Sequence, residues 1–421
     1  MSTKGNQNKS RSGLFAALDV GTTKMCCFIA KASVDKGLEI VGIGHQVSKG
    51  LRAGTIVNMD DAEASIRATV EAAEQMAGEN IREVYVNLSG GNPASKLIAY
   101  EIELAGHQIG DNDLRRVLDV SSVLKDQPSD YELVHAIPVG YSIDGNRGVR
   151  DPRGMYGQRL GVNMHIVGAS SGALRNLSTC ISRCHLGIAD KVVAPYASAL
   201  STLVEDEIQL GVTLIDMGGG TTSIAVFFDG ELVHTDVLPV GGGHVTKDVA
   251  RGLSTPLEHA ERMKTLYGSA LPSPSDDREV ISVPQIGEDR TGEMTQVPRS
   301  MLVGIIRPRL EETFEMVRSR LEAAGFDKVA GRRVVLTGGA SQLPGARELA
   351  GMILDKQVRQ GLVRPAEGLA ESMSGPAFAT CAGLLNFAVN NQAEGASHAY
   401  RPTEGPSSRF GRLGQWFREN F

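Results

Sequence analysis

Two short turns, both rich in glycine and threonine, each interrupt an apolar run just after an aspartate. The first is ALDVGTTKM around Asp19, and the second is LIDMGGGTTS around Asp216. A tight turn of this kind presents backbone N–H groups, which hold phosphate oxygens, beside a carboxylate, which holds a hydrated Mg²⁺. A single such turn is equally typical of an ordinary hairpin. Two copies with matched flanking segments predict two loops that clamp a polyphosphate from opposite sides.

A third glycine-rich segment, VVLTGGASQLPG at 334–345, combines an apolar strand, a glycine pair and the start of a helix. Alone it is an ordinary loop between a strand and a helix. Together with the two aspartate turns it offers bare backbone against which an adenosine can lie, because glycine has no Cβ to hold a ligand away. The chain has no G-x-x-x-x-G-K-[ST] sequence and no G-x-G-x-x-G after a strand, so P-loop and Rossmann sites are disfavoured.

The elements around the two turns are similar. We predict strands at 14–19, 25–32 and 38–44 around the first turn, followed by a helix from 60 to 78 and a strand at 83–88. Strands at 212–216, 224–228 and 232–238 surround the second turn, about 200 residues further on. The repeated unit predicts an internal duplication, with two related halves.

Composition narrows the class of protein. At 421 residues, the chain is long enough for two to four domains, and 41% hydrophobic with 22% charged residues is ordinary for a soluble globular protein. A net charge of −6 gives no broad surface for nucleic acid. No apolar run reaches the length of a membrane span and the polar start has no signal-peptide core, so we expect a cytoplasmic body.

The end of the chain has a different character. Residues 390–408 are a flexible linker by composition, and 409–421 read RFGRLGQWFRENF. At helical spacing, five apolar side chains of this tail share one side, and two arginines project elsewhere. We therefore predict a helix that binds an anionic membrane surface, the alternative being a terminal helix docked on the protein's own body. The apolar set is Phe410, Leu413, Trp416, Phe417 and Phe421, and the arginines are Arg412 and Arg418.

The motifs resemble those of a known superfamily. DVGTTKM, DMGGGTTS and LTGGASQLPG look like the two phosphate motifs and the adenosine motif of the ATPases related to actin, sugar kinases and heat-shock chaperones. VAPYASAL at 193–200 and SGPAFATCAGLL at 374–385 resemble its two connecting helices, in the right order. Within the superfamily the chain is most similar to the FtsA family, bacterial cell-division proteins that tether tubulin-like FtsZ to the membrane.

The resemblance implies an α/β, actin-like fold. Two related, ribonuclease-H-like halves would surround a nucleotide cleft, with an α+β insert in the first half. The expected divisions are a disordered N-terminus 1–13, a first half 14–90 and 169–208, an insert subdomain 91–168 (the 1C subdomain of the FtsA family), a second half 209–253 and 330–389, a subdomain 2B at 254–329, the linker 390–408 and the membrane-targeting helix 409–421.

It also implies the site residues for ATP and Mg²⁺. Glu261 and Lys264 would touch the ribose and adenine, although a surface ion pair between residues i and i+3 is an equally good interpretation of their spacing. Asp19 and Asp216 would orient Mg²⁺. The phosphate clamp would be Gly21, Thr22, Thr23, Lys24, Gly218, Gly219, Gly220 and Thr221, and the adenosine pocket would be lined by Gly338, Gly339 and Ser341.

One departure from the pattern concerns hydrolysis. Filament-forming relatives have Gln or Glu before the proline of the first connecting helix, where this chain has Ala194 before Pro195. The resemblance thus implies at most a weak ATPase.

The implied role is that of a scaffold on the cytoplasmic face of the inner membrane at the division site. Its partners would be the FtsZ C-terminal peptide at subdomain 2B, further copies of itself in filaments, later division proteins at the insert, and anionic lipids. A pilus-assembly protein like PilM and a small-molecule kinase on the same core are the alternatives.

Overall fold

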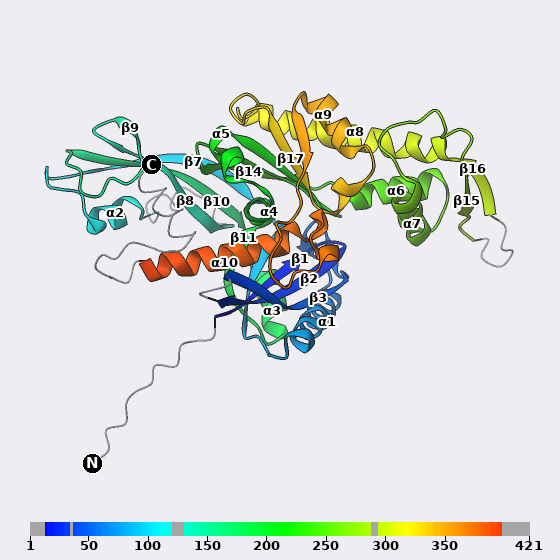
Figure 1. The fold of residues 1–421 in the computed structure, drawn as a ribbon, viewed down its shortest axis with the longest axis horizontal. Helices are drawn as coiled ribbons and strands as arrows, with labels where there is room; N and C mark the ends of the chain where they lie inside the picture. The colour runs from blue at the N-terminus through cyan, green and yellow to red at the C-terminus, as the bar shows by residue number, and fades with distance from the viewer. Residues whose placement is uncertain (1–12, 34–36, 120–129, 288–293, 398–421) are drawn as a thin grey trace, which may run out of the picture.

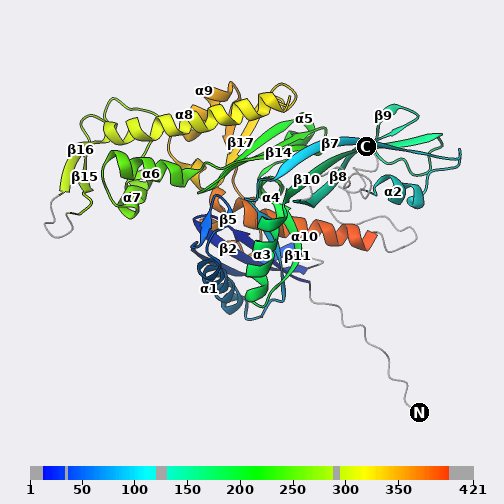
Figure 2. The same cartoon turned by 180° about the vertical axis from the view of Figure 1, so that it is seen from behind.

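The computed structural model describes residues 13–33, 37–119, 130–287 and 294–397. Most of the N-terminal segment expected to be disordered, residues 398–408 of the expected linker and the whole expected amphipathic helix lie outside these ranges. Figures 1 and 2 show an elongated molecule, with the sheet of the insert at one end and the β15–β16 pair (Val280–Pro284 and Met294–Pro298) at the other.

The first sheet has the strand order β3-β2-β1-β6-β11. The first three strands run antiparallel, whereas β6 is parallel to β1, and β11 to β6. Helix α1 begins where the Asn58 side chain accepts the N–H groups of Asp60 and Asp61, and it ends at Gly78, whose φ is 69°. The elements are β1 (Leu14–Val20), β2 (Lys24–Ser33), β3 (Gly37–Val47), the short pair β4 (Leu51–Arg52) and β5 (Thr55–Ile56), α1 (Met59–Ala77), β6 (Glu83–Leu88), α3 (Ser171–Arg183) and β11 (Gly187–Val193).

The second sheet repeats this topology with the order β14-β13-β12-β17-β18. Strands β12 to β14 are antiparallel, β17 is parallel to β12, and β18 to β17. Asp19 and Asp216 occupy the same place, one residue before the end of the first strand of each sheet. The predicted duplication is therefore confirmed. The elements are α5 (Glu205–Leu210), β12 (Val212–Met217), β13 (Thr222–Phe228), β14 (Glu231–Leu238), β17 (Arg333–Thr337), α9 (Ala346–Leu354) and β18 (Gln357–Gln360).

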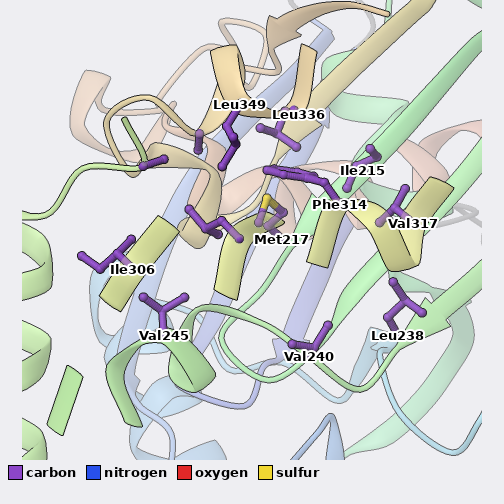
Figure 3. Close-up of a cluster of buried hydrophobic side chains, with 14 of the residues drawn as sticks. Ile215, Met217, Leu238, Val240, Val245, Ile306, Phe314, Val317, Leu336 and Leu349 are labelled. Atoms are coloured by element: carbon purple, nitrogen blue, oxygen red, sulfur yellow. The ribbon is translucent and has the colours of Figure 1, made fainter. Parts of the chain in front are cut away.

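An apolar cluster beneath the second sheet anchors the strand that carries Asp216. Figure 3 shows Phe314 of α8 (Arg299–Ala323) among Ile215 and Met217 of β12 and Leu336 of β17, and all four side chains are buried. Helices α6 (Gly242–Gly252) and α7 (Leu257–Tyr267) extend the cluster toward β15 and β16. The backbone before the second aspartate turn is thus held by the core, which fixes where the turn begins.

The insert is a separate antiparallel sheet in the order β7-β10-β8-β9, with its own apolar cluster under α2. It also touches the second half, because the Ser95 hydroxyl of β7 donates to the Thr235 carbonyl of β14 at 2.9 Å and accepts the Thr235 N–H at 3.1 Å. The elements are β7 (Ala94–Glu103), α2 (Asp111–Val117), β8 (Tyr131–Ile143), β9 (Asn146–Val149) and β10 (Arg159–Ser170).

Two helices connect the halves and cross in direct contact. These are α4 (Ala194–Thr202) and α10 (Ala379–Ser397), and a Cβ added at Gly383 of α10 would overlap the carbonyl of Ala197 in α4. Helix α10 corrects one expectation, because residues 390–397 of the expected linker are helical. The sequence NNQAEGAS there contains good helix formers and no proline, so it continues the helix that the buried part of α10 nucleates. None of the described helices has the length and apolar character needed to cross a membrane.

The helix crossing gives a stability prediction. We expect Gly383→Ala to lower the free energy of unfolding by about 1–3 kcal/mol or more, because the added methyl group forces α4 and α10 apart. Gly304 is the matched control, a glycine inside α8 whose Cβ position faces open space. Gly304→Ala should instead stabilise by about 0.5–1 kcal/mol through helix propensity. Urea unfolding followed by circular dichroism measures both, and equal effects of the two substitutions would contradict the close crossing.

Candidate functional site

Asp19 is buried at the end of β1 and is oriented by Asn87 of β6. The Asn87 side-chain amide donates to Asp19 Oδ1 at 2.7 Å, and its oxygen accepts the N–H of Val20, also at 2.7 Å. Burial raises the pKa of Asp19 to about 7, partly opposed by the positive charge of Lys24 and reinforced by the carboxylate of Asp216. An acidic group held this far above its ordinary pKa gains most from a nearby cation.

Asp216 is the matching carboxylate of the second half. Its Oδ2 accepts hydrogen bonds from the hydroxyls of Ser198 in α4, at 2.6 Å, and Thr380 in α10, at 3.2 Å. Burial raises the pKa of Asp216, while these two hydroxyls and Lys24 oppose the shift. The carboxylate is therefore connected to both helices that join the halves.

The two phosphate-type turns touch each other across the halves. A Cβ at Gly219 would overlap the side chain of Thr23, and one at Gly220 would lie 2.6 Å from the hydroxyl oxygen of Thr22. The second turn is closed by a hydrogen bond from the N–H of Gly218 to the carbonyl of Thr221 at 2.8 Å. Glycine is required at both contact positions, because any side chain there would push the two turns apart.

Lys24 lies between the turns and the start of α10. Its Nζ donates to the carbonyl of Ala377 at 2.5 Å and stands 3.4 Å from the centre of the Phe378 ring. Its positive charge opposes the rise that burial causes in the pKa of Asp19 and of Asp216. In this structure Lys24 therefore bridges the first turn and the 376–378 segment.

The residues expected around adenosine also come together. Lys264 Nζ donates to Glu261 Oε2 at 2.7 Å, to Thr246 Oγ1 at 2.9 Å and to the carbonyl of Gly242 at 3.3 Å. The hydroxyl of Thr246 in turn donates to Glu261. Thus Glu261 and Lys264 do form the ion pair of the simpler interpretation, but the pair is joined to α6 by Thr246 and Gly242.

The loop after β17 completes this group. A Cβ at Gly242 would lie 2.9 Å from the Cβ of Ala340, so the start of α6 packs against the 338–341 loop. Gly338 adopts φ of 84°, and a Cβ there would overlap Oδ1 of Asp216. Ser341 is buried, donates to the carbonyl of Gly338 at 2.7 Å and accepts from Gln360, so it shapes the loop from within.

Several participants were not predicted from the sequence. Asn87, Ser198, Thr380 and Thr246 bind the predicted residues through their side chains, and α6 was missed altogether. The sequence does contain a signal for Asn87, because it is a polar residue near the end of an apolar strand next to the Asp19 strand. The glycines at the start of α6 are a second signal in the sequence. Ser198 and Thr380 lie in segments identified only as connecting helices, where small polar residues are common.

The structure tests whether these residues suit Mg²⁺ and a nucleotide. Within the described ranges no group of three or more His, Cys, Asp or Glu side chains is placed to bind a metal ion. Two buried carboxylates near one lysine fit a cation that keeps most of its water, which is how Mg²⁺ usually binds.

The side chains predicted to touch a membrane, Phe410 to Phe421, lie outside the described residues.

Two sheets of one topology, joined by crossing helices and bearing facing aspartate turns, define an actin-like fold. The solved structures that share it include the following two. A chain of the PilM–PilN type IV pilus biogenesis complex matches with a TM-score of 0.63 and 18% identity, over 89% of this chain and 98% of that chain. MreB5 of Spiroplasma citri bound to AMPPNP matches with a TM-score of 0.56 and 14% identity, over 92% and 99%. At such identities the likeness shows the fold alone.

Sequence comparison shows the family. Residues 213–383 match the model of the cell division protein FtsA, and residues 90–168 match that of the SHS2 domain inserted in FtsA. FtsA of Rhizobium meliloti (strain 1021) is 44% identical over 423 residues, 98% of this chain and 96% of that protein. FtsA of Escherichia coli (strain K12) is 30% identical over 420 residues, 97% and 98%. The chain belongs to the FtsA family, and the predicted resemblance is confirmed.

The buried Asp19 carboxyl predicts a pH effect on stability without nucleotide. The pKa of Asp19 is about 7 in the folded protein, against an ordinary value of 3.8 for the unfolded chain. Between these two pH values the folded protein keeps a proton that the unfolded chain has released. The stability from this group is complete below pH 4 and is lost as the pH rises through 7. The substitution Asp19→Asn replaces the carboxyl by a group that does not titrate, so the variant should not lose this stability as the pH rises. We expect its free energy of unfolding, relative to the parent, to increase by about 2–3 kcal/mol between pH 5 and 8. Urea titrations at both pH values measure this, and a pH-independent difference would contradict the buried carboxyl.

Proposed function

We propose that this protein binds Mg²⁺–ATP between its two halves and acts as a scaffold that tethers FtsZ filaments to the membrane during division. The contact between the two aspartate turns carries the nucleotide part of the proposal, because it brings both sets of phosphate-binding groups to one place. Asp19 and Asp216 would orient Mg²⁺, and the backbone of the two turns would hold the phosphates. Glu261 and Lys264, with the 338–341 loop, would hold adenosine. When bound, Mg²⁺ neutralises phosphate charge.

The contact between the two aspartate turns also bears on how nucleotide binding would affect the two halves. Gly219 and Gly220 lie against Thr23 and Thr22, and we infer that a triphosphate held by both turns would move them apart. Nucleotide binding would therefore change the relation between the halves, with α4 and α10 as the connection that bends. A ligand shifts a conformational equilibrium only by its differential affinity for the two states, and contacts to both turns supply that difference.

Asp216→Ala tests the nucleotide site. Removing one of the two carboxylates should weaken ATP binding strongly in the presence of Mg²⁺, by about tenfold or more, because a hydrogen-bonded charged partner contributes ~1.5–3 kcal/mol. Isothermal titration calorimetry with and without Mg²⁺ measures the change. Parent-like affinity of the variant with Mg²⁺ present would remove Asp216 from the site.

We further propose that hydrolysis is slow. The position before Pro195 is held by Ala194, whose buried methyl group cannot polarise water. General-base assistance contributes ~10²–10⁴ in rate, so its loss leaves ATP acting mainly as a ligand. This supports a scaffold over a kinase of the same fold.

The surface of the region at 254–329 supports a peptide-binding role toward the FtsZ C-terminal peptide. Large apolar side chains are exposed in this region, and three of them, Tyr267, Val280 and Met301, lie close to the start of α8. Arg299 Nε donates to the carbonyl of Tyr267 at 2.8 Å, and Val280 pairs with Pro298, so α7, β15 and α8 meet at this point. The exposed residues are Leu257, Leu266, Tyr267, Val280, Ile286, Met294 and Met301.

Met301→Glu tests that surface. Met301 is 49% exposed, so the substitution should leave the fold intact while placing a charge in the apolar surface. We expect binding of a fluorescent FtsZ C-terminal peptide to weaken by about tenfold, measured by anisotropy. The control is Met352→Glu on α9, where Met352 is 64% exposed. If both variants bind as the parent does, the peptide binds elsewhere.

We also propose that the insert mediates self-association into filaments and contacts later division proteins, and that the tail 409–421 binds anionic lipid, which would make the protein peripheral to the cytoplasmic face of the inner membrane. Thirteen residues are too few for a stable helix in water, so the tail would order on binding. One copy would bind reversibly and an assembled array far more tightly, through avidity.

Trp416→Glu places a charge on the apolar side of that tail. Burying one large apolar side chain contributes ~1.5–3 kcal/mol, so we expect binding to anionic vesicles to fall by about tenfold or more. Co-sedimentation with vesicles measures this, with a chain ending at Ser408 as the limiting case. If both bind as well as the parent, the tail is not the anchor.

A further inference from the structure

Asp216 receives side chains from both connecting helices. The hydroxyls of Ser198 and Thr380 lie 2.9 Å from each other, and both reach Oδ2 of Asp216. All three residues are buried. The hydroxyl pair spans the crossing of α4 and α10, so the three side chains form one network across three elements.

The two oxygens of Asp216 have different surroundings. Oδ2 accepts the two hydroxyls, whereas Oδ1 faces Gly338, where a Cβ would overlap it. The network thus fixes the rotation of the carboxylate about its last bond and directs Oδ1 to the side of Gly338, at the start of the 338–341 loop.

We propose that Ser198 and Thr380 are positioning residues for the metal ion of the nucleotide, an inference that rests on the proposed binding of Mg²⁺–ATP. They hold Oδ2 so that Oδ1 is presented in a fixed direction to hydrated Mg²⁺. Because the two hydroxyls come from different helices, the direction of Oδ1 depends on how α4 and α10 cross. Mg²⁺–ATP affinity and the helix crossing are then reciprocally linked.

The competing explanation is that the hydroxyls only satisfy a buried carboxylate. Both roles predict some loss of stability when a hydroxyl is removed. Only the positioning role predicts that the loss of ATP affinity depends on Mg²⁺, because only then does the orientation of Asp216 act on the ligand through the metal ion.

The chain offers matched variants. Ser198→Ala and Thr380→Val each remove a hydroxyl from the network, and Thr380→Ser restores one. Ser201→Ala is the control, since the Ser201 hydroxyl also spans the helix crossing, donating to the carbonyl of Ala379 at 2.7 Å, but does not bond to Asp216. Calorimetric ATP affinity is measured for each full-length variant with excess Mg²⁺ and with EDTA, alongside its thermal unfolding.

For Ser198→Ala and Thr380→Val we expect about 5- to 20-fold weaker ATP binding with Mg²⁺ and less than a twofold change in EDTA. Ser201→Ala and Thr380→Ser should keep the Mg²⁺ dependence of the parent. If the parent shows Mg²⁺-dependent binding and the two test variants keep it, or lose affinity equally in EDTA, the positioning role is wrong. If the parent itself binds no ATP, the proposed function fails instead.

Discussion

The burial of two carboxylates at equivalent strand ends is the constraint on which the rest of this structure depends. Taking a carboxylate out of water is costly unless hydrogen bonds and opposite charge compensate, and the pKa of about 7 at Asp19 shows that compensation there is incomplete. Further buried polar groups therefore bind each aspartate: Asn87 of β6 binds Asp19, and two hydroxyls from the connecting helices α4 and α10 bind Asp216. These partners in turn decide which elements must meet at the site.

In the first half, hydrogen bonds connect Asp19 through Asn87 to the base of the insert. Asn87 also donates to the Ser89 hydroxyl at 2.9 Å, just before the insert begins. The β4–β5 hairpin adds a second route, since the N–H of Gly54 donates to the Thr22 hydroxyl at 2.9 Å and the Thr55 hydroxyl accepts the N–H of Gly91 at 3.3 Å. A displacement of the first turn must break these bonds or carry the hairpin and the insert base with it.

Strands, turns and the repeated unit could be predicted from the sequence, because each depends on a local pattern of residues. The Asp-turn units around Asp19 and Asp216 predicted the duplicated sheets, because alternating apolar residues and glycine turns act over a few neighbours. Contacts between segments far apart in the chain could not be predicted from such local patterns. Ser198 and Thr380 are 182 positions apart and become partners only because α4 and α10 cross. The end of α10 was missed because polar composition indicates a linker, whereas a helix already nucleated by packing extends through such residues.

The same geometry gives a physical basis for the proposed scaffold role, in which nucleotide binding would matter more than nucleotide cleavage. In the proposed complex, Mg²⁺ would supply the positive charge that the two buried carboxylates lack, and the backbone of the two turns, which touch through glycines in the structure, would hold the phosphates. The gain on binding would then come from neutralising the buried carboxylates, which requires no bond cleavage. Because Asp216 is held by both connecting helices and Asp19 is connected through Asn87 to Ser89 beside the insert, this neutralisation would act at the helix crossing and at the insert base together. A ligand that reorganises two connected charges can therefore set the relation between subdomains without being consumed.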